Sequence, residues 1–207
     1  MELPTALAQH RAQLLACRAC PQVVGPPVTN VAAQAQIYLM GQAPGPKEQQ
    51  QGAPFVGPAG RTLFRWLATL GVAEDTFRQR VYMGAVIRCF PGKTPGQQGD
   101  RKPAPGEITL CRAHLERELA LLSPKLVVAV GRMAIETWLP VPRLDDVVGQ
   151  VFRVQHQSAS QNVTVDVLPL PHPSGLNRWI QKDPGKSLLA QALNLLGQQP
   201  VWRNTFP

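Results

Sequence analysis

Long hydrophobic runs are missing from this sequence of 207 residues, and no segment approaches the roughly 18 consecutive apolar residues of a membrane-spanning helix. The first residues, MELPTALAQHR, are polar and contain no apolar core of a signal peptide. The sequence also contains no internal repeat and no GxGxxG motif, which disfavours a dinucleotide-binding fold. We therefore expect a soluble intracellular protein with no membrane partner.

Acidic residues are scarce relative to basic ones. Lys and Arg number 21 against 13 Asp and Glu, which gives a net charge of +8. Such an excess favours a polyanionic partner such as a nucleic acid, although a merely soluble basic protein is the alternative. The chain is 44% hydrophobic, enough to bury a core, so we expect one domain over residues 1–207, with two small domains as the alternative.

Apolar runs alternate with amphipathic segments along the chain. The runs predict strands at 37–40, 81–90, 125–131 and 163–170. The segments between and beside them predict helices at about 5–17, 59–70, 107–122 and 132–139, and a last helix at 184–196 opened by Asp183 and Pro184. In the second helix Leu63, Trp66, Leu67 and Leu70 share one face. This alternation predicts a mainly parallel sheet covered by helices on both faces.

Each predicted strand ends in an unusual segment: GQAPG, RCFPGK, VGR and LPHPSGLNR. Each segment alone has the alternative interpretation of an ordinary Gly/Pro turn. Because the carboxyl ends of parallel strands meet at one edge of the sheet, we expect the four segments to form one ligand site there.

The connection GQAPGPKEQQQGAPFVGPAGR, residues 41–61, holds five glycines, four prolines and a single Phe55. Glycine lets a backbone approach a ligand closely, and proline holds its path rigid. The segment is therefore typical of a loop that brings backbone N–H groups to a ligand.

Cysteine is rare, with four residues in the whole chain. Cys17 and Cys20 form a CxxC pair, whereas Cys89 and Cys111 are separated by a long loop and form no second CxxC of the kind that zinc ribbons contain. Disulfides are disfavoured inside a cell, which leaves a metal site or four unrelated buried thiols.

The segments GQAPG, GAPFVGPAGR and HPSGLNR, together with the four cysteines, closely resemble the uracil-DNA glycosylase superfamily, in particular its iron-sulfur families 4 and 5. The resemblance covers about residues 17–196 and implies an α/β fold of three layers, α/β/α, around a mainly parallel four-stranded sheet. It also implies a monofunctional DNA repair enzyme that flips uracil out of DNA and hydrolyses its N-glycosidic bond. We expect a monomer that binds uracil-containing DNA in a bacterial cytoplasm, associated with the nucleoid.

The resemblance implies roles for residues in the base pocket. Phe55 would stack on the flipped uracil, although a core anchor that pins the loop is the alternative. The backbone of Gly41, Gln42 and Ala43 would bind the uracil carbonyl oxygens. His172 would stabilise the charge on the departing uracil. Ala85 would lie at the uracil edge.

The DNA contacts follow from the same resemblance. Leu176 would fill the space left by the flipped base, while Arg178 would bind a phosphate. Ser174 would contact the DNA backbone, and Asn177 the backbone or a base edge. The loop at 90–107 supplies further expected backbone contacts: Lys93, Arg101 and Lys102.

The resemblance further implies that Cys17, Cys20, Cys89 and Cys111 hold a 4Fe-4S cluster with a structural role, since hydrolysis of a glycosidic bond requires no electron.

This sequence departs from both families. Family 4 has a carboxylate where this chain has Gln42, and an Asn where this chain has Ala85. Family 5 has an acidic residue where Pro58 stands. Gln42 and Glu48 are the catalytic candidates of the first loop besides His172, with Glu48 either positioning water or simply solvated. A module that binds damaged DNA, with weak or altered-base glycosylase activity, is the alternative function.

Overall fold

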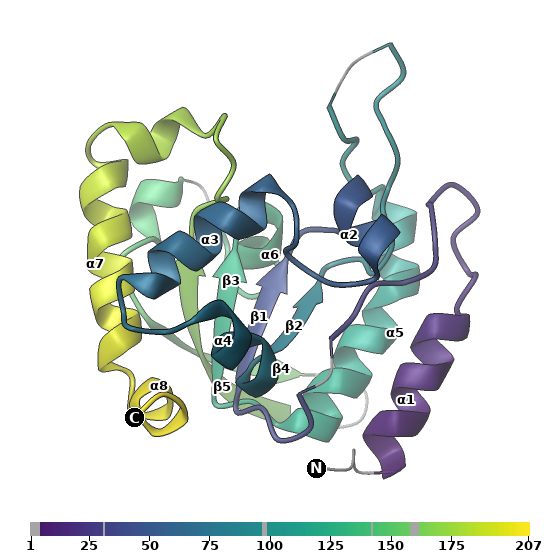
Figure 1. The fold of residues 1–207 in the computed structure, drawn as a ribbon, viewed down its shortest axis with the longest axis horizontal. Coiled ribbons are helices and arrows are strands. Elements are labelled where there is room, and N and C mark those ends of the chain that lie inside the picture. The colour runs from purple at the N-terminus through teal and green to yellow at the C-terminus, as the bar shows by residue number, and fades with distance from the viewer. Residues whose placement is uncertain (1–4, 31, 97–98, 142, 158–161) are drawn as a thin grey trace.

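The computed structural model describes residues 5–30, 32–96, 99–141, 143–157 and 162–207, and a five-stranded sheet lies at its centre (Figure 1). The strands are β1 (Ile37–Gly41), β2 (Tyr82–Ala85), β3 (Leu126–Val130), β4 (Phe152–Gln157) and β5 (Asn162–Leu170), in the order β2-β1-β3-β5-β4. The pairs β1–β2, β1–β3 and β3–β5 are parallel, and β4 is antiparallel to β5 at the edge. The mainly parallel sheet is confirmed, with one strand more than predicted.

The extra strand β4 escaped prediction because its sequence, FRVQHQ, mixes apolar and polar residues. Within it only His156 is buried. In contrast, β1 and β3 are buried along their whole length, because helices cover both faces of the central strands. The sequences of central parallel strands are therefore continuous apolar runs, whereas the sequence of an edge strand is not.

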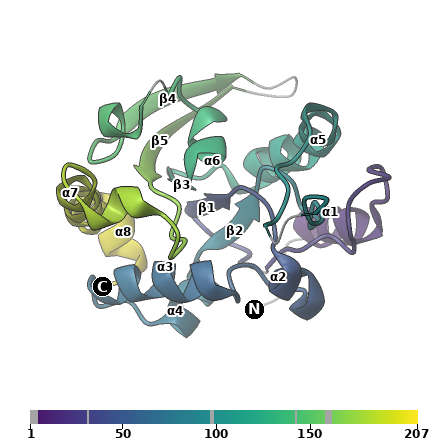
Figure 2. The ribbon, with the colours of Figure 1, turned by 90° about the horizontal axis from the view of Figure 1, so that it is seen from above.

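The helices form layers on both faces of the sheet, which confirms the three-layer architecture (Figure 2). In both views α3 and α4 cover one face, α6 lies on the other, and α1 and α5 lie together beyond β2 while α7 lies at the opposite side. The helices are α1 (Thr5–Ala16), α2 (Pro46–Gln51), α3 (Pro58–Ala68), α4 (Glu74–Arg80), α5 (Pro105–Leu122), α6 (Arg132–Glu136), α7 (Gly185–Gln198) and α8 (Pro200–Thr205). Sequence patterns missed α2, α4 and α8, which are too short to show a helical period.

The predicted apolar face of α3 is confirmed. Leu63 and Leu67 are buried, and Trp66 and Leu70 pack against the same core. Helix α7 begins at Gly185 with Pro184 as its N-cap, one residue later than predicted. Asp183 still accepts a hydrogen bond at its carboxylate from the backbone N–H of Ser187 at 3.2 Å.

Strand β2 ends at Ala85, five residues earlier than the sequence suggests. The N–H groups of Val86 and Ile87 still donate to the carbonyls of Gly41 and Gln42, and Phe90 then pairs with Val24 in an antiparallel bridge. The chain after β2 therefore leaves the sheet and runs beside the segment that follows the CxxC pair, which explains why its buried residues resemble a longer strand.

Candidate active site

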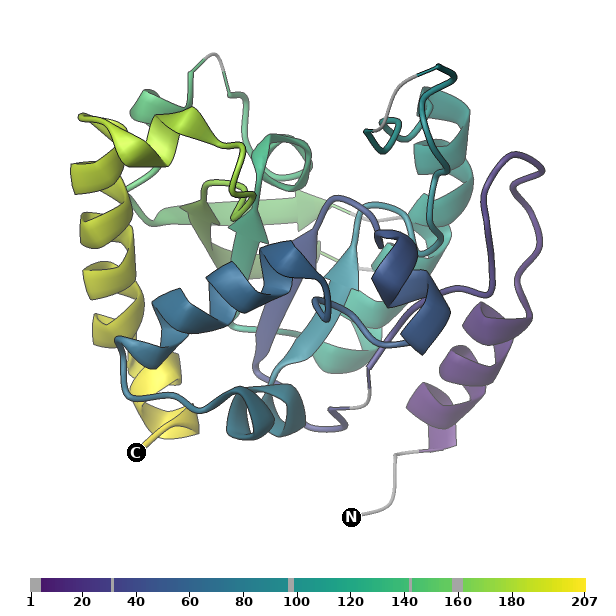
Figure 3. The ribbon, with the colours of Figure 1, turned by 45° about the horizontal axis from the view of Figure 1, so that its top comes forward.

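A cleft of about 670 Å³ lies at the carboxyl ends of the parallel strands. Figure 3 shows the loops after these strands around that edge, with α2 and α3 beside them. The cleft brings together the predicted site residues from four separate segments: Gly41, Gln42, Ala43, Glu48, Phe55, Ala85, Lys93, Arg101, His172, Ser174 and Leu176. Lys102, Asn177 and Arg178 are not among its lining residues. The predicted convergence of the strand-end segments is therefore observed, while the role of each residue stays a prediction.

Phe55 lies over the end of β1 with its backbone in the left-handed region, at φ 56°. This conformation is rare for an aromatic residue and requires support from the surrounding structure. A Cβ atom at Gly41 would lie 2.9 Å from Cζ of Phe55, so the ring covers the backbone at the start of the first loop.

Two residues hold Phe55 in this strained position. The Arg78 guanidinium donates to the carbonyl of Pro54 at 2.8 Å and to that of Phe55 at 3.0 Å. Gly60 in α3 packs directly under the loop, because a Cβ atom there would lie 1.8 Å from the carbonyl oxygen of Phe55. Sequence reasoning missed Arg78, whose contacts span 23 and 24 residues and leave no local pattern. The ring is partly buried against the core and also lines the cleft.

Glu48 braces the two ends of the first loop. Its Oε1 accepts a hydrogen bond from the N–H of Gly57 at 2.7 Å, and its Oε2 accepts one from the N–H of Gly45 at 3.2 Å. Each of the two carboxylate oxygens therefore has a backbone partner, which gives Glu48 a structural role at the N-terminus of α2. A role in positioning water stays a prediction.

His172 follows β5 and lies beside Gly131, the first residue after β3. A Cβ atom at Gly131 would lie 3.2 Å from Cδ2 of the imidazole, and Gly131 has a positive φ of 86°. Only glycine combines this backbone with the close approach of the ring. Although His172 is exposed at the cleft, the surrounding protein desolvates its ring and lowers its pKa below the ordinary value. The imidazole is therefore neutral at neutral pH.

The loop after His172 is held by its own polar groups. Asn177 donates from Nδ2 to the carbonyl of His172 at 2.8 Å and accepts at Oδ1 from the N–H of Trp179 at 3.1 Å. Ser174 accepts at Oγ from the N–H of Leu176 at 3.2 Å. These bonds present the Leu176 side chain to solvent with 92% of its surface exposed, and Arg178 is exposed beside it.

The basic loop carries ion pairs that the sequence did not reveal. Lys93 pairs with Asp100 at 2.5 Å. Arg101 forms two hydrogen bonds to the Glu107 carboxylate and a third, at 3.0 Å, to the carbonyl of Gln22. Arg101 thus ties the loop to the start of α5 and to the N-terminal segment. The carboxylates among the lining residues of the cleft are those of Glu48 and Asp100.

All four cysteines line a second cavity of about 70 Å³, between α1, the segment after β2 and α5. Burial and the neighbouring thiols raise the pKa of Cys89 to about 12, and burial also raises the pKa values of Cys20 and Cys111. Among the described residues, no three His, Cys, Asp or Glu side chains lie close enough together to hold a single metal ion. Four thiols around one cavity are instead the donor set of a larger centre.

Arg88 also lines this cavity, and its charge partly offsets the rise in the pKa of Cys111 that burial causes. Cysteine binds iron as the thiolate, so four thiols around one cavity beside a cation are suited to a cluster. The residues present therefore fit a bound iron-sulfur cluster.

Comparison with known proteins identifies the family. The model of the uracil DNA glycosylase superfamily matches residues 28–197, which is most of the chain and includes the whole cleft. The chain belongs to the uracil-DNA glycosylase superfamily. This confirms the resemblance that its motifs showed.

Similar members of this superfamily come from archaea and bacteria. The Type-4 uracil-DNA glycosylase of Archaeoglobus fulgidus is 31% identical over 148 residues, which cover 69% of this chain and 67% of that protein. The Type-4 enzyme of Thermotoga maritima is 28% identical over 167 residues, 78% of each chain. The Type-5 uracil-DNA glycosylase of Pyrobaculum aerophilum is 27% identical over 154 residues, 69% of this chain and 63% of that protein. In the described part of this superfamily member, no helix is long and apolar enough to cross a membrane.

Proposed function

We propose that this protein is a uracil-DNA glycosylase that flips uracil out of DNA and hydrolyses its N-glycosidic bond, leaving an abasic site. One observation carries the proposal: an aromatic ring, an imidazole and an exposed apolar side chain from three separate segments surround a single cleft. These are the parts that base flipping requires, namely a stacking surface, a donor for the leaving group and a wedge.

The chemistry follows from the positions of these groups. Phe55 covers one face of the pocket over Gly41, so a flipped uracil stacks on its ring. The bond between the sugar C1′ and the uracil N1 breaks, and its electron pair leaves with the base. His172, held neutral by desolvation, donates an N–H to the uracil oxygen on which negative charge develops. Water adds to C1′ and loses a proton to solvent, and the uracil anion takes up a proton from solvent, which completes the hydrolysis.

The carboxylates of the cleft explain how this site differs from its relatives. Gln42 replaces the carboxylate of family 4, Glu48 is engaged by backbone N–H groups, and Asp100 is paired with Lys93. A slow reaction that depends mainly on leaving-group stabilisation is therefore expected. The same observation supports the second candidate function, a module that binds damaged DNA with weak or altered-base turnover.

Uracil-containing single-stranded and duplex oligonucleotides distinguish the two functions. Purified protein in excess over the oligonucleotide should release free uracil and leave sites that alkali cleaves. Tight binding of the uracil duplex without release of the base would favour the binding module. Oligonucleotides with other deaminated bases test whether the protein excises a base other than uracil.

For the cofactor, we propose that Cys17, Cys20, Cys89 and Cys111 hold a 4Fe-4S cluster. The cluster supplies no chemistry to the hydrolysis and instead fixes the ends of the 90–110 segment against α1. Aerobically purified protein should be brown, with about four iron atoms per chain. Colourless protein with stoichiometric zinc would contradict this assignment.

We expect the chain to form a single domain and to act as a monomer, on DNA in the bacterial cytoplasm.

A further inference from the structure

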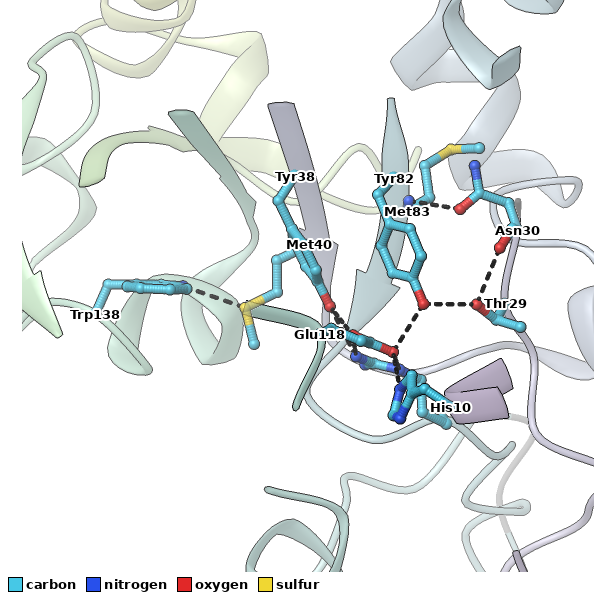
Figure 4. A network of polar contacts seen from close by, with 10 residues as sticks. His10, Thr29, Asn30, Tyr38, Met40, Tyr82, Met83, Glu118 and Trp138 are labelled. Atoms are coloured by element: carbon cyan, nitrogen blue, oxygen red, sulfur yellow. Dashed lines mark hydrogen bonds and ion pairs between the residues drawn. The ribbon is translucent and has the colours of Figure 1, made fainter. Parts of the chain in front are cut away.

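The two sides of the cleft are supported in different ways. On one side, a buried polar network centres on the carboxylate of Glu118 in α5 (Figure 4). The network reaches the cleft at Gly84, where a Cβ atom would lie 2.0 Å from the hydroxyl oxygen of Tyr38. That hydroxyl donates to Oε2 of Glu118 at 2.5 Å. The network therefore supports the cleft from beneath the end of β2.

Glu118 holds this side through several contacts at once. Besides the bond from Tyr38, its carboxylate accepts hydrogen bonds from Tyr82 at 2.9 Å and from Arg88. His10 lies 3.5 Å from Oε1. Because four side chains surround one carboxylate, the loss of a single hydrogen bond leaves the other partners in place.

The other side of the cleft is the loop after β5, which carries both His172 and Leu176. Its own hydrogen bonds close this loop on itself, such as the bond from Asn177 to the carbonyl of His172. Within the described part of the chain, a single hydrogen bond ties residues 171–181 to a segment outside them. Nε1 of Trp179 donates it to Oδ1 of Asp145 at 2.6 Å. The polar attachment of this side therefore depends on one contact.

Asp145 is a fixed and charged acceptor. It lies in a short 3-10 turn, and Val147 and Val148, which follow that turn, are buried in the core. The hydrogen bonds from Trp179 and Arg143 lower the pKa of Asp145 below its ordinary value, so its carboxylate is ionised at neutral pH. A hydrogen bond to an ionised acceptor is stronger than one between neutral groups.

Trp179 is also held by α7 and passes this support to the loop. A Cβ atom at Gly185 would lie 2.1 Å from the carbonyl oxygen of Trp179 and 2.6 Å from its Cδ2, so only glycine permits this contact. The backbone N–H of Trp179 donates to Oδ1 of Asn177, whose Nδ2 donates to the carbonyl of His172. A chain of hydrogen bonds therefore runs from Asp145 through Trp179 to the backbone of His172.

We infer that Trp179, anchored by Asp145, is the positioning residue of the loop after β5 and holds both the leaving-group donor and the wedge in place. This inference rests on the proposed function and assigns a role in it to two residues outside the cleft lining. Because the donor and the wedge share one loop, a displacement of that loop weakens both at once. A displacement of about 1 Å in a reacting group lowers rates by up to about 100-fold.

The test removes the anchoring hydrogen bond and measures single-turnover excision of uracil with the full chain in excess over the oligonucleotide. Trp179→Phe keeps an aromatic ring beside Gly185 and removes the N–H donor. The rate on a uracil-containing single strand should fall about 10-fold, because His172 is displaced. The rate on a duplex should fall about 100-fold, because the displaced Leu176 also fails to fill the space left by the base.

Variants of the acceptor give the same test from the other end of the bond. Asp145→Ala should lower the two rates in the same pattern, and it serves if Trp179→Phe fails to fold. Asp145→Asn keeps an acceptor oxygen for the indole N–H and should retain rates close to those of the wild type.

A second background separates positioning from loss of folded protein. In His172→Ala, the additional change Trp179→Phe should not slow excision from the single strand further, because the group through which it acts is gone. Tyr82→Phe is the matched control, since it also removes side-chain hydrogen bonds while the other partners of Glu118 remain. It should lower the melting temperature and leave both excision rates unchanged.

Three results would overturn the inference, and they differ from one another. Wild-type protein that releases no uracil would overturn the proposed function and this inference with it. An active wild type beside Trp179→Phe and Asp145→Ala variants with wild-type rates would overturn this inference alone. A loss in Trp179→Phe that is equal on both substrates, and equal with and without His172, would also overturn it, because Trp179 would then only stabilise the fold.

Discussion

At the scale of single residues, the strained backbone of Phe55 is the feature that most clearly separates what sequence reveals from what only structure reveals. A lone aromatic residue among glycines and prolines predicted a stacking group, and the ring does lie over Gly41 in the cleft. The positive φ and the hydrogen bonds from Arg78 were not predictable, because they depend on contacts between distant segments. Strain that persists under such support is typical of functional sites.

The position of His172 was predicted from the HPS motif, whereas its environment was not. Gly131, which comes from a motif that alone suggested an ordinary turn, leaves room for the ring. The roles of Glu48 as a brace and of Asn177 as a loop support likewise became visible only through their partners.

The lowered pKa of His172 predicts the pH dependence of excision. Because the folded-state pKa lies below the ordinary value of about 6.5, the imidazole stays neutral at every higher pH. The ratio of the single-turnover rates of wild type and His172→Ala should therefore be constant from pH 7 to pH 9 and change only below about pH 6.5. A wild-type inflection above pH 7 that disappears in His172→Ala would show that the pKa is raised instead.

The same shift has a consequence for stability. Between the lowered folded-state pKa and the unfolded-state value, the unfolded chain binds more protons at His172 than the folded chain does. The contribution of His172 to stability is therefore lost as the pH falls through that window.

At the scale of elements, the sequence predicted the buried parallel strands and the longer helices, and it missed the short or half-exposed elements. Strands β1, β3 and β5 and helix α5 lie close to their expected positions because each has a strong apolar signal. The edge strand β4 lacks that signal. Helix α2, of six residues, begins at Pro46, and the Glu48 carboxylate accepts a hydrogen bond from the N–H of its N-cap residue, Gly45. Short helices of this kind depend on tertiary support that a local pattern does not contain.

The wedge loop after β5 yields a prediction at this scale. Leu176→Ala should lower excision from a uracil-containing duplex much more than excision from a single strand, because only the duplex loses stacking when the base flips. The measurement compares single-turnover rates on the two substrates. Val24→Ala is the matched control, since Val24 is also an exposed apolar residue, at 45%, but lies outside the cleft lining. Equal losses on both substrates would place Leu176 in the base pocket instead.

At the scale of the whole molecule, the net charge of +8 predicted a polyanionic partner, and the membership of the uracil-DNA glycosylase superfamily agrees with DNA. The net charge alone did not reveal which basic residues are available to bind DNA phosphates. Lys93 and Arg101 have carboxylate partners, whereas Lys102 and Arg178 are exposed in the structure. Composition gives the total charge, and only the fold shows how much of it is offset locally.

The salt dependence of DNA binding tests this distribution of charge. Lys102→Ala and Arg178→Ala should each flatten the slope of log affinity against log salt by about one unit, the value expected for one lost phosphate contact. Arg101→Ala should change the slope less and mainly lower the stability of the loop, because its charge is already paired with Glu107. Unchanged slopes for Lys102→Ala and Arg178→Ala would place the DNA on another face.

The central claim is that the cleft excises uracil chiefly by stabilising the departing base, and single-turnover excision of uracil from an oligonucleotide tests it most directly. Wild-type protein should release uracil, and His172→Ala should do so about 100- to 1000-fold more slowly, the cost of losing one donor to a developing anion. Glu48→Gln, which keeps a carbonyl acceptor for the loop brace, should slow the reaction far less. An inactive wild type, or a fully active His172→Ala beside an inactive Glu48→Gln, would contradict the account.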